Sequence, residues 1–217
     1  MACRHVLFID PLEKLNLKKD STLLLGASMR ARGMQVAVLF EKDFYVENQA
    51  PVRWMVHTFE ADFDPSTFAL TRFDLGEPQE WELGPTDVVH MRLDPPFDGR
   101  YLRYLWMLEF LAGRGVLVMN APGGVARFNE KIYAFAQEQS HPTFIGRSLA
   151  RALEFAHRLR REGHVSMVVK PLDLYQGMGV EKVDITQPDV SLSAYLERRI
   201  QELQGGMVAQ PFIAKVA

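Results

Sequence analysis

The sequence has little cysteine and no long apolar run. Cys3 is the only cysteine among 217 residues, so the chain can form no internal disulfide and lacks the paired cysteines of common zinc sites. Its first ten residues hold only about four consecutive apolar side chains, far short of a signal peptide or of the roughly 20 that span a bilayer. We therefore expect a cytoplasmic protein that is neither secreted nor embedded in a membrane.

The sequence also lacks an excess of charge of one sign. It has 25 Lys and Arg against 27 Asp and Glu, a formal net charge of -2, which gives no overall reason to bind nucleic acid or an anionic membrane surface. A hydrophobic content of 47% with 24% charged residues is that of an ordinary globular protein. We expect small molecules as partners.

Two familiar nucleotide motifs are missing. Neither the three-glycine dinucleotide fingerprint nor the P-loop with Gly-Lys-Ser/Thr occurs, so a nucleotide would need another kind of site. Lys170 closes an apolar segment, and Gly177-Met178-Gly179 follows it closely. A lysine offers a compact positive charge to phosphate oxygens, and glycine lets backbone amides approach an anion. Taken alone, the same residues fit an ordinary strand end and hairpin turn equally well.

The first half of the chain has the pattern of a doubly wound α/β domain. Apolar strands are expected at 6–9 and 34–40, joined by a helix that Asp20 or Ser21 caps and Gly33 ends. Such a crossover makes the two strands parallel, and ligands usually bind beyond the carboxyl ends of parallel strands. Asp10-Pro11 and 92–96 lie at such ends, although acids and prolines there are also common turn residues.

The remaining pattern predicts a second, smaller α+β domain. Residues 1–122 form the first predicted domain, with a meander at 52–73, and 123–217 form the second, with 120–124 as linker. In the second, helices are expected through Lys131, from Ser148 to Gly163 and from Leu192 to Gly205, and strands at 143–145, 165–170, 177–183 and 207–213.

Several short segments, in order along the whole chain, resemble prokaryotic glutathione synthetase, a ligase of the ATP-grasp family. They are Asp10-Pro11 with 16–21, the diproline loop 91–98, Asn129-Glu130-Lys131, Val169-Lys170-Pro171-Leu172-Asp173, and Gln210-Pro211-Phe212-Ile213. The resemblance implies a Rossmann-like pre-ATP-grasp domain followed by the small lobe of an ATP-grasp domain. It also implies that ATP phosphorylates the carboxylate of gamma-glutamylcysteine and that the amine of glycine attacks the acyl phosphate.

The same resemblance assigns roles to residues. Lys131 and Lys170 would contact the phosphates of ATP, Gly177, Met178 and Gly179 would form a lid over them, and Gln210, Pro211, Phe212 and Ile213 would border adenine. Arg92, Asp94, Asp10 and Lys18 would bind the dipeptide substrate, although Arg92 could instead form an ion pair with Asp94 or Asp98. Family members of this kind are often homo-oligomers.

The chain departs from the family pattern in its lid and its length. Leu174-Tyr175-Gln176 lengthens the phosphate loop, Val180 replaces a glycine, and Leu93 replaces a charged residue. The chain also ends just after the adenine segment, so the lobe that carries the Mg²⁺ ligands is expected outside it, and no catalytic or metal-binding residue is expected within it. We expect a fragment of a longer ligase, inactive alone. The alternatives are a shortened nucleotide- or dipeptide-binding protein and an ATP-grasp ligase for other substrates.

Overall fold

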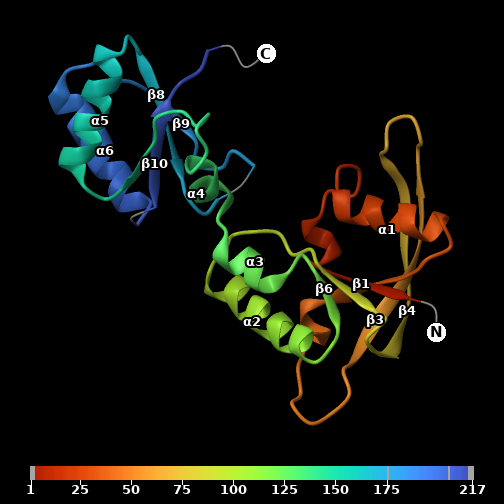
Figure 1. Cartoon of the computed structure of the whole chain (residues 1–217). Coiled ribbons are helices and arrows are strands. Elements are labelled where there is room, and N and C mark those ends of the chain that lie inside the picture. Colours follow the sequence, from red (N-terminus) through yellow and green to blue (C-terminus); the bar gives the residue numbers. More distant parts are fainter. Residues whose placement is uncertain (1–2, 175, 205, 215–217) are drawn as a thin grey trace. The chain divides into compact units, whose positions relative to one another are not determined.

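The computed structural model describes residues 3–174, 176–204 and 206–214 and contains two compact units (Figure 1). Unit 1 consists of Met1–Asp94 and Gly99–Arg127, and unit 2 of Pro95–Asp98 and Phe128–Ala217. Each unit has its own sheet, and each combines strands with helices. The predicted α/β class is confirmed.

Unit 1 is built on a six-stranded sheet in the order β4-β3-β2-β1-β5-β6. Strands β1 (Arg4–Ile9), β2 (Gln35–Phe40), β5 (Val88–Met91) and β6 (Leu117–Met119) are parallel, and β3 (Arg53–Phe63) with β4 (Leu70–Glu82) forms an antiparallel hairpin. Helix α1 (Ser21–Ala31) connects β1 to β2, and α2 (Gly99–Gly113) connects β5 to β6. Because these crossovers run in opposite directions from the centre, right-handed connections put the helices on opposite faces. The doubly wound prediction is confirmed, and the strand order reverses between β1 and β5.

Local sequence explains how β1 and α1 form. Alternate residues of β1 face opposite sides, so Leu7 and Ile9 join the core cluster that includes α1, whereas the ring of Phe8 meets Tyr104 of α2 edge-on at 5.4 Å. Asp20 caps α1 as predicted, because its Oδ1 accepts hydrogen bonds from the amides of Thr22 and Leu23 at 2.9 and 2.8 Å.

The expected linker at 120–124 is wrong in part, because Pro122 begins helix α3 (Pro122–Arg127). Proline suits the first helical position, where its missing N–H has no partner to lose. The carboxylate of Glu109 accepts the amide hydrogen of Gly123 at 2.9 Å, which satisfies one of the free donors at the helix start. This contact with α2 helps the segment with Gly123 and Gly124 to form a helix.

Unit 2 is an antiparallel sheet covered by two helices on one face. Its elements are α4 (Glu130–Phe135), β7 (Phe144–Gly146), α5 (Leu149–Arg161), β8 (Ser166–Pro171), β9 (Glu181–Asp184), α6 (Asp189–Glu202) and β10 (Met207–Pro211), with the sheet order β7-β10-β8-β9. Figure 1 shows α5 and α6 side by side next to β10. Their apolar side chains, such as Leu159 and Leu196, share a core with Met167 and Val169 of β8.

Two expected strands of unit 2 are shorter than predicted. Residues 177–180 form a turn before β9, since Gly177 and Gly179 have φ values of +77° and +68° that an extended strand does not allow. Strand β10 ends at Pro211, opposite Met167, because its partner β8 begins at Ser166. Gly205, predicted to end α6, lies outside the described residues. No helix in the described part of the chain is long and apolar enough to cross a bilayer.

Candidate functional site

Lys170 and Gln210 lie on the face of the unit 2 sheet that is opposite to its helices. In β8, Met167 and Val169 point into the helix-covered core, so the alternation of a strand places Lys170 on the other face. In the strand register, Lys170 is opposite Val208 and Gln210 is opposite Val168. Two residues that were predicted from separate segments therefore share one surface of the sheet.

Lys131 reaches the loop that follows β8. Asn129 caps α4, and the Nζ of Lys131 donates to the carbonyl oxygens of Leu172 and Leu174 at 2.9 and 3.0 Å. A third contact joins Nζ to the Glu130 carboxylate at 2.6 Å. An ammonium group has three hydrogens, so all of its donors are engaged. Any phosphate bound here has to replace at least one of these partners.

One of the two predicted phosphate lysines feels the charge of the other. Burial lowers the pKa of the Lys170 ammonium, and the positive charge of Lys131 lowers it further. Like charges brought together in a partly buried place raise the free energy of the empty site. A bound polyanion would remove that cost, which makes this surface suitable for phosphate.

The predicted glycine turn is present and needs glycine. Gly177 and Gly179 adopt left-handed conformations, and the amide of Val180 donates to the carbonyl of Gly177 at 3.2 Å. A Cβ atom on Gly179 would lie 3.3 Å from the ring of Pro171, so close packing also favours glycine there. Met178 is exposed at the top of the turn, and Tyr175 of the lengthened loop lies outside the described residues.

The residues of the predicted adenine segment are not all on the same face of the sheet: Pro211 is on the face covered by helices, and Gln210 is on the other. Gln210 donates from Nε2 to the hydroxyl of Thr143 at 2.9 Å, and Ile213 is partly exposed. Pro211 is buried opposite Met167, a residue of the helix-covered core. Phe212 follows the strand, and the ammonium of Lys182 lies 3.9 Å from its ring centroid.

Sequence reasoning missed Lys182 and Arg199 in unit 2. Lys182 is opposite Val168 in the sheet, so it shares the face of Lys170, and the alternation of strand 181–184 could have shown this. Arg199 is only 5% exposed, although it is charged. It lies between Leu196 and Leu203 on the apolar stripe of its helix. A charged residue within such a stripe is unusual, and this signal could have singled out Arg199 from the sequence.

In unit 1, the predicted substrate residues Asp10 and Asp94 meet at the ends of β1 and β5. The Asp10 carboxylate accepts the amide hydrogen of Asp94 at 2.7 Å and lies 3.5 Å from the guanidinium of Arg100. Burial and the negative charges of Asp10 and Asp20 raise the pKa of the Asp94 carboxyl. The edge of the sheet at the reversal point is thus acidic and suited to an ammonium group.

Arg92 lies at the same edge and contacts helix α1. Its Nε donates to the hydroxyl of Thr22 at 2.8 Å, and its Nη2 contacts the hydroxyl of Ser21 at 3.3 Å. These bonds tie Arg92 to the helix start rather than to Asp94. Lys18, in the loop before α1, is exposed.

A cavity of about 760 Å³ lies beyond the ends of β1 and β2, and sequence reasoning missed its polar residues. Its lining includes Pro11, Leu12, Glu41 and Tyr104. Arg100 holds the Glu41 carboxylate in a two-point contact at 3.0 and 2.7 Å. Burial would raise the pKa of the Glu41 carboxyl, but hydrogen bonds from Tyr104 and Arg100 bring it below its ordinary value. Fold position alone, at strand ends, would have pointed to Glu41.

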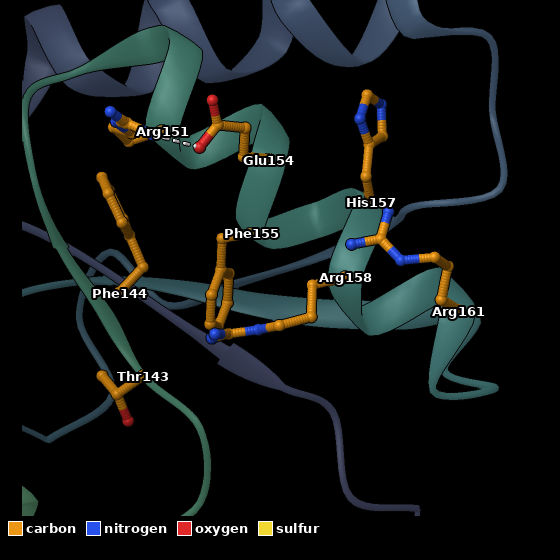
Figure 2. A pocket seen from close by; sticks show the side chains of 8 residues that line it. All are labelled: Thr143, Phe144, Arg151, Glu154, Phe155, His157, Arg158 and Arg161. Carbon is orange, nitrogen blue, oxygen red and sulfur yellow. Dashed lines mark hydrogen bonds and ion pairs between the residues drawn. The ribbon is translucent and has the colours of Figure 1, made fainter.

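Unit 2 also has a groove of about 520 Å³ along α5, shown in Figure 2. Its lining combines Phe144 and Phe155 with several charged side chains of α5. Arg151 forms an ion pair with Glu154 at 2.7 Å, and the Arg158 guanidinium lies 5.0 Å from the Phe155 ring centroid (Figure 2). None of the predicted ATP residues lines this groove, so its volume does not make it the nucleotide site.

A magnesium site is not formed by the described residues. Across 3–174, 176–204 and 206–214, no group of three or more His, Cys, Asp or Glu side chains is arranged to hold a metal ion. Magnesium prefers several oxygen ligands in near-octahedral geometry. The residues present do not fit this ion, and no chemical step of this chain can be assigned through it.

Comparison with known proteins gives the family. The model of the family "Prokaryotic glutathione synthetase, N-terminal domain" matches residues 3–126. The chain is 30% identical over 193 residues to glutathione synthetase of Pseudomonas putida and 29% identical over 218 residues to that of Pseudomonas aeruginosa. These matches cover 88% and 100% of this chain but 58% and 65% of the relatives, so the chain spans less than two thirds of their length.

Solved structures agree on the fold. D-cycloserine synthetase DcsG is similar with a TM-score of 0.57 and 15% identity, over 96% of this chain and 59% of that one. Macrocyclase MdnC from Microcystis aeruginosa is similar with a TM-score of 0.53 and 17% identity, over 97% and 66%. The chain belongs to the prokaryotic glutathione synthetase family.

Proposed function

We propose that this member of the prokaryotic glutathione synthetase family supplies the N-terminal and ATP-lid regions of an ATP-dependent carboxylate-amine ligase. The proposed substrates are ATP, gamma-glutamylcysteine and glycine, with glutathione, ADP and phosphate as products. The observation that carries the proposal is the placement of Lys131 and Lys170 beside the loop that leads into the Gly177–Gly179 turn. In domain terms, we assign 1–122 to the substrate-binding domain and 123–217 to a partial ATP-grasp domain.

ATP would bind against the face of the unit 2 sheet that carries Lys170. Phosphate oxygens would take the ammonium hydrogens that Lys131 now gives to Leu172 and Leu174, which frees the loop to move over the phosphates. Fixed cations stabilise the charge of a transferring phosphoryl group. Gln210, Phe212 and Ile213 would border the adenine, with Lys182 placed over the ring of Phe212.

The dipeptide would bind at the acidic edge of unit 1. Asp94, whose carboxylate accepts no hydrogen bond within the described part of the chain, would receive the ammonium group, and Arg92 would turn from its two hydroxyl partners to a substrate carboxylate. Asp10 holds the Asp94 backbone, which makes it a positioning group. Lys18 would add charge near the carboxylate.

The remaining parts of the proposal concern magnesium, cellular location and oligomeric state. Magnesium, when bound with ATP, would neutralise phosphate charge, and its ligands are assigned to the part of the relatives that this chain does not match. We also propose a cytoplasmic homo-oligomer, as the thiol substrate and the family suggest. A nucleotide- or dipeptide-binding protein without ligase activity is the competing proposal, and an ATP-grasp ligase for other substrates is a further alternative.

Two measurements test the proposal. Titration calorimetry of the 217-residue chain with ATP should show binding that Lys170→Met weakens. The reading frame that contains this chain should release ADP in a glycine-dependent manner with gamma-glutamylcysteine. ATP binding without any such release would favour the competing proposal, and absence of ATP binding would contradict the ligase and the nucleotide-binding protein alike.

A further inference from the structure

Arg199 is a buried charged residue that contacts the glycine turn. It lies on α6 with 5% of its surface exposed, and a buried guanidinium is stable only with hydrogen-bonded partners. Its Nη2 donates to the carbonyl of Gly179 at 2.7 Å, and its Nη1 contacts the carboxylates of Glu202 and Glu181 at 2.7 and 3.1 Å. A helix on one face of the sheet thereby holds the last glycine of the turn.

The residue after the turn is held from the same helix. Glu181 begins β9 and accepts a hydrogen bond from the hydroxyl of Tyr195 at 3.1 Å. Burial and this bond raise the pKa of Tyr195 to about 12. Arg199 and Tyr195 therefore fix the point at which the turn enters the sheet.

The two ends of the phosphate loop are held differently. Lys131 holds the beginning through Leu172 and Leu174, and a phosphate can compete for that ammonium. Arg199 holds the end and contacts Glu181, which is opposite Val169 of the helix-covered core. Lys170 points to the other face, so Arg199 keeps its partners when ATP binds.

We propose that Arg199 is a positioning residue that anchors the exit of the phosphate lid, so that the amides of 177–179 stay directed at the phosphates. This inference rests on the proposed ATP function. The loop joins β8, which ends at Pro171, to β9, which begins at Glu181, and a loop of this length loses conformational freedom when it closes over a ligand. An anchor at its exit limits that loss before ATP arrives.

The test uses three variants of the 217-residue chain beside the unmodified one. Arg199→Met removes the bond to Gly179, and Arg199→Lys keeps the charge. Arg198→Met is the matched control, because Arg198 contacts Glu202 at 2.7 Å and Glu181 at 3.7 Å, with a side chain that is 52% exposed. Amide hydrogen exchange of 176–181 without ATP, ATP affinity and thermal stability are measured for each.

We expect Arg199→Met to speed exchange at 176–181 and to weaken ATP binding by about tenfold, as loss of a charged hydrogen bond allows. Arg199→Lys should recover part of both, and Arg198→Met should change neither. Glu202→Gln separates stability from positioning, since it weakens an ion pair of Arg199 and leaves the Gly179 bond in place. It should lower the melting temperature with little change in ATP affinity.

Several results would overturn the inference. One is a folded Arg199→Met chain with unchanged exchange at 176–181 or unchanged ATP affinity. Another concerns Glu202→Gln. If this variant lost as much stability and as much ATP affinity as Arg199→Met, the role of Arg199 would be purely structural. If the unmodified chain binds no ATP, the proposed function fails, and exchange at 176–181 alone decides whether Arg199 anchors the turn.

Discussion

The two units hold their functional side chains in different ways. In unit 1, Asp10 and Arg92 are bound by groups on neighbouring elements, namely the amide of Asp94 and the hydroxyls of Thr22 and Ser21. In unit 2, Lys131 is bound by carbonyl oxygens of the loop that it is proposed to open and close. In the proposed function, Arg92 of unit 1 changes its side-chain partners on strands that stay in place, whereas ligand binding in unit 2 has to move the loop that Lys131 contacts.

This contrast indicates that the backbone should move on ligand binding in unit 2 and not in unit 1. In the proposed function, a ligand of unit 1 would exchange one set of side-chain partners of Arg92 for another and leave the strands in place. A phosphate bound by Lys131 would release the backbone at Leu172 and Leu174, and loops with few fixed contacts open at low cost in free energy. The following predictions test this contrast, from the largest effect to the smallest.

The largest effect concerns the cores that support the two sites. Leu105→Ala in unit 1 and Leu159→Ala in unit 2 each remove a side chain that is at most 1% exposed. Each should lower the free energy of unfolding of its own unit by about 3 kcal/mol, because a buried cavity is left. Calorimetry should show one shifted transition per variant. Equal shifts of every transition in both variants would contradict separate units.

ATP affinity should depend on unit 2 alone. Lys170→Met should weaken ATP binding by roughly 10- to 100-fold, since a charged contact to phosphate is lost. Calorimetric titration measures the change. Arg151→Met is the control, because it removes a positive charge from unit 2 at a side chain that is 72% exposed and paired with Glu154. Equal losses in both variants would mean that overall charge, rather than the site, binds ATP.

Dipeptide affinity should depend on unit 1. Arg92→Met should weaken binding of gamma-glutamylcysteine by about tenfold, because the carboxylate loses its guanidinium partner. ATP affinity should stay unchanged, as titrations with the two ligands can show. Arg103→Met, at an exposed position of α2, serves as the control. Loss of ATP affinity in Arg92→Met would break the proposed division between the units.

The smallest effect is a pH dependence confined to unit 1. Burial, with smaller effects from His5 and Arg92, lowers the pKa of His90 to about 4. The unfolded chain therefore takes up the proton first as pH falls from about 6.5 towards 4, so stability is complete above this window and decreases through it. The expected loss is about 1 kcal/mol after allowance for partial exposure.

His90→Asn should flatten this slope in chemical unfolding curves recorded from pH 7 to 4. The exposed His141→Asn serves as the control and should leave the slope as it is. An unchanged slope in His90→Asn would show that the imidazole pair of His5 and His90, with nitrogens 3.0 Å apart, does not govern acid stability.

Sequence patterns predict most of the fold because apolar periodicity and caps are local. The Asp20 cap, the parallel β1–β2 pair and strand β8 all follow from such patterns. The helix at Pro122 was missed because its support comes from Glu109, which is distant in sequence. Lys131 and Lys170 could be named from the family resemblance. The apolar stripe of its helix could mark Arg199 as unusual but not show its role, which comes from a contact across twenty residues with Gly179.

The most direct test of the contrast is amide hydrogen exchange of the chain with and without a non-hydrolysable ATP analogue. The structure predicts that the analogue changes exchange at 172–174 and 176–180 and leaves the strand ends at Asp10 and Arg92 unchanged. Lys170→Met should abolish that change. An altered exchange at Asp10 and Arg92, with none at 172–174 or 176–180, would contradict the assignment of ATP to unit 2.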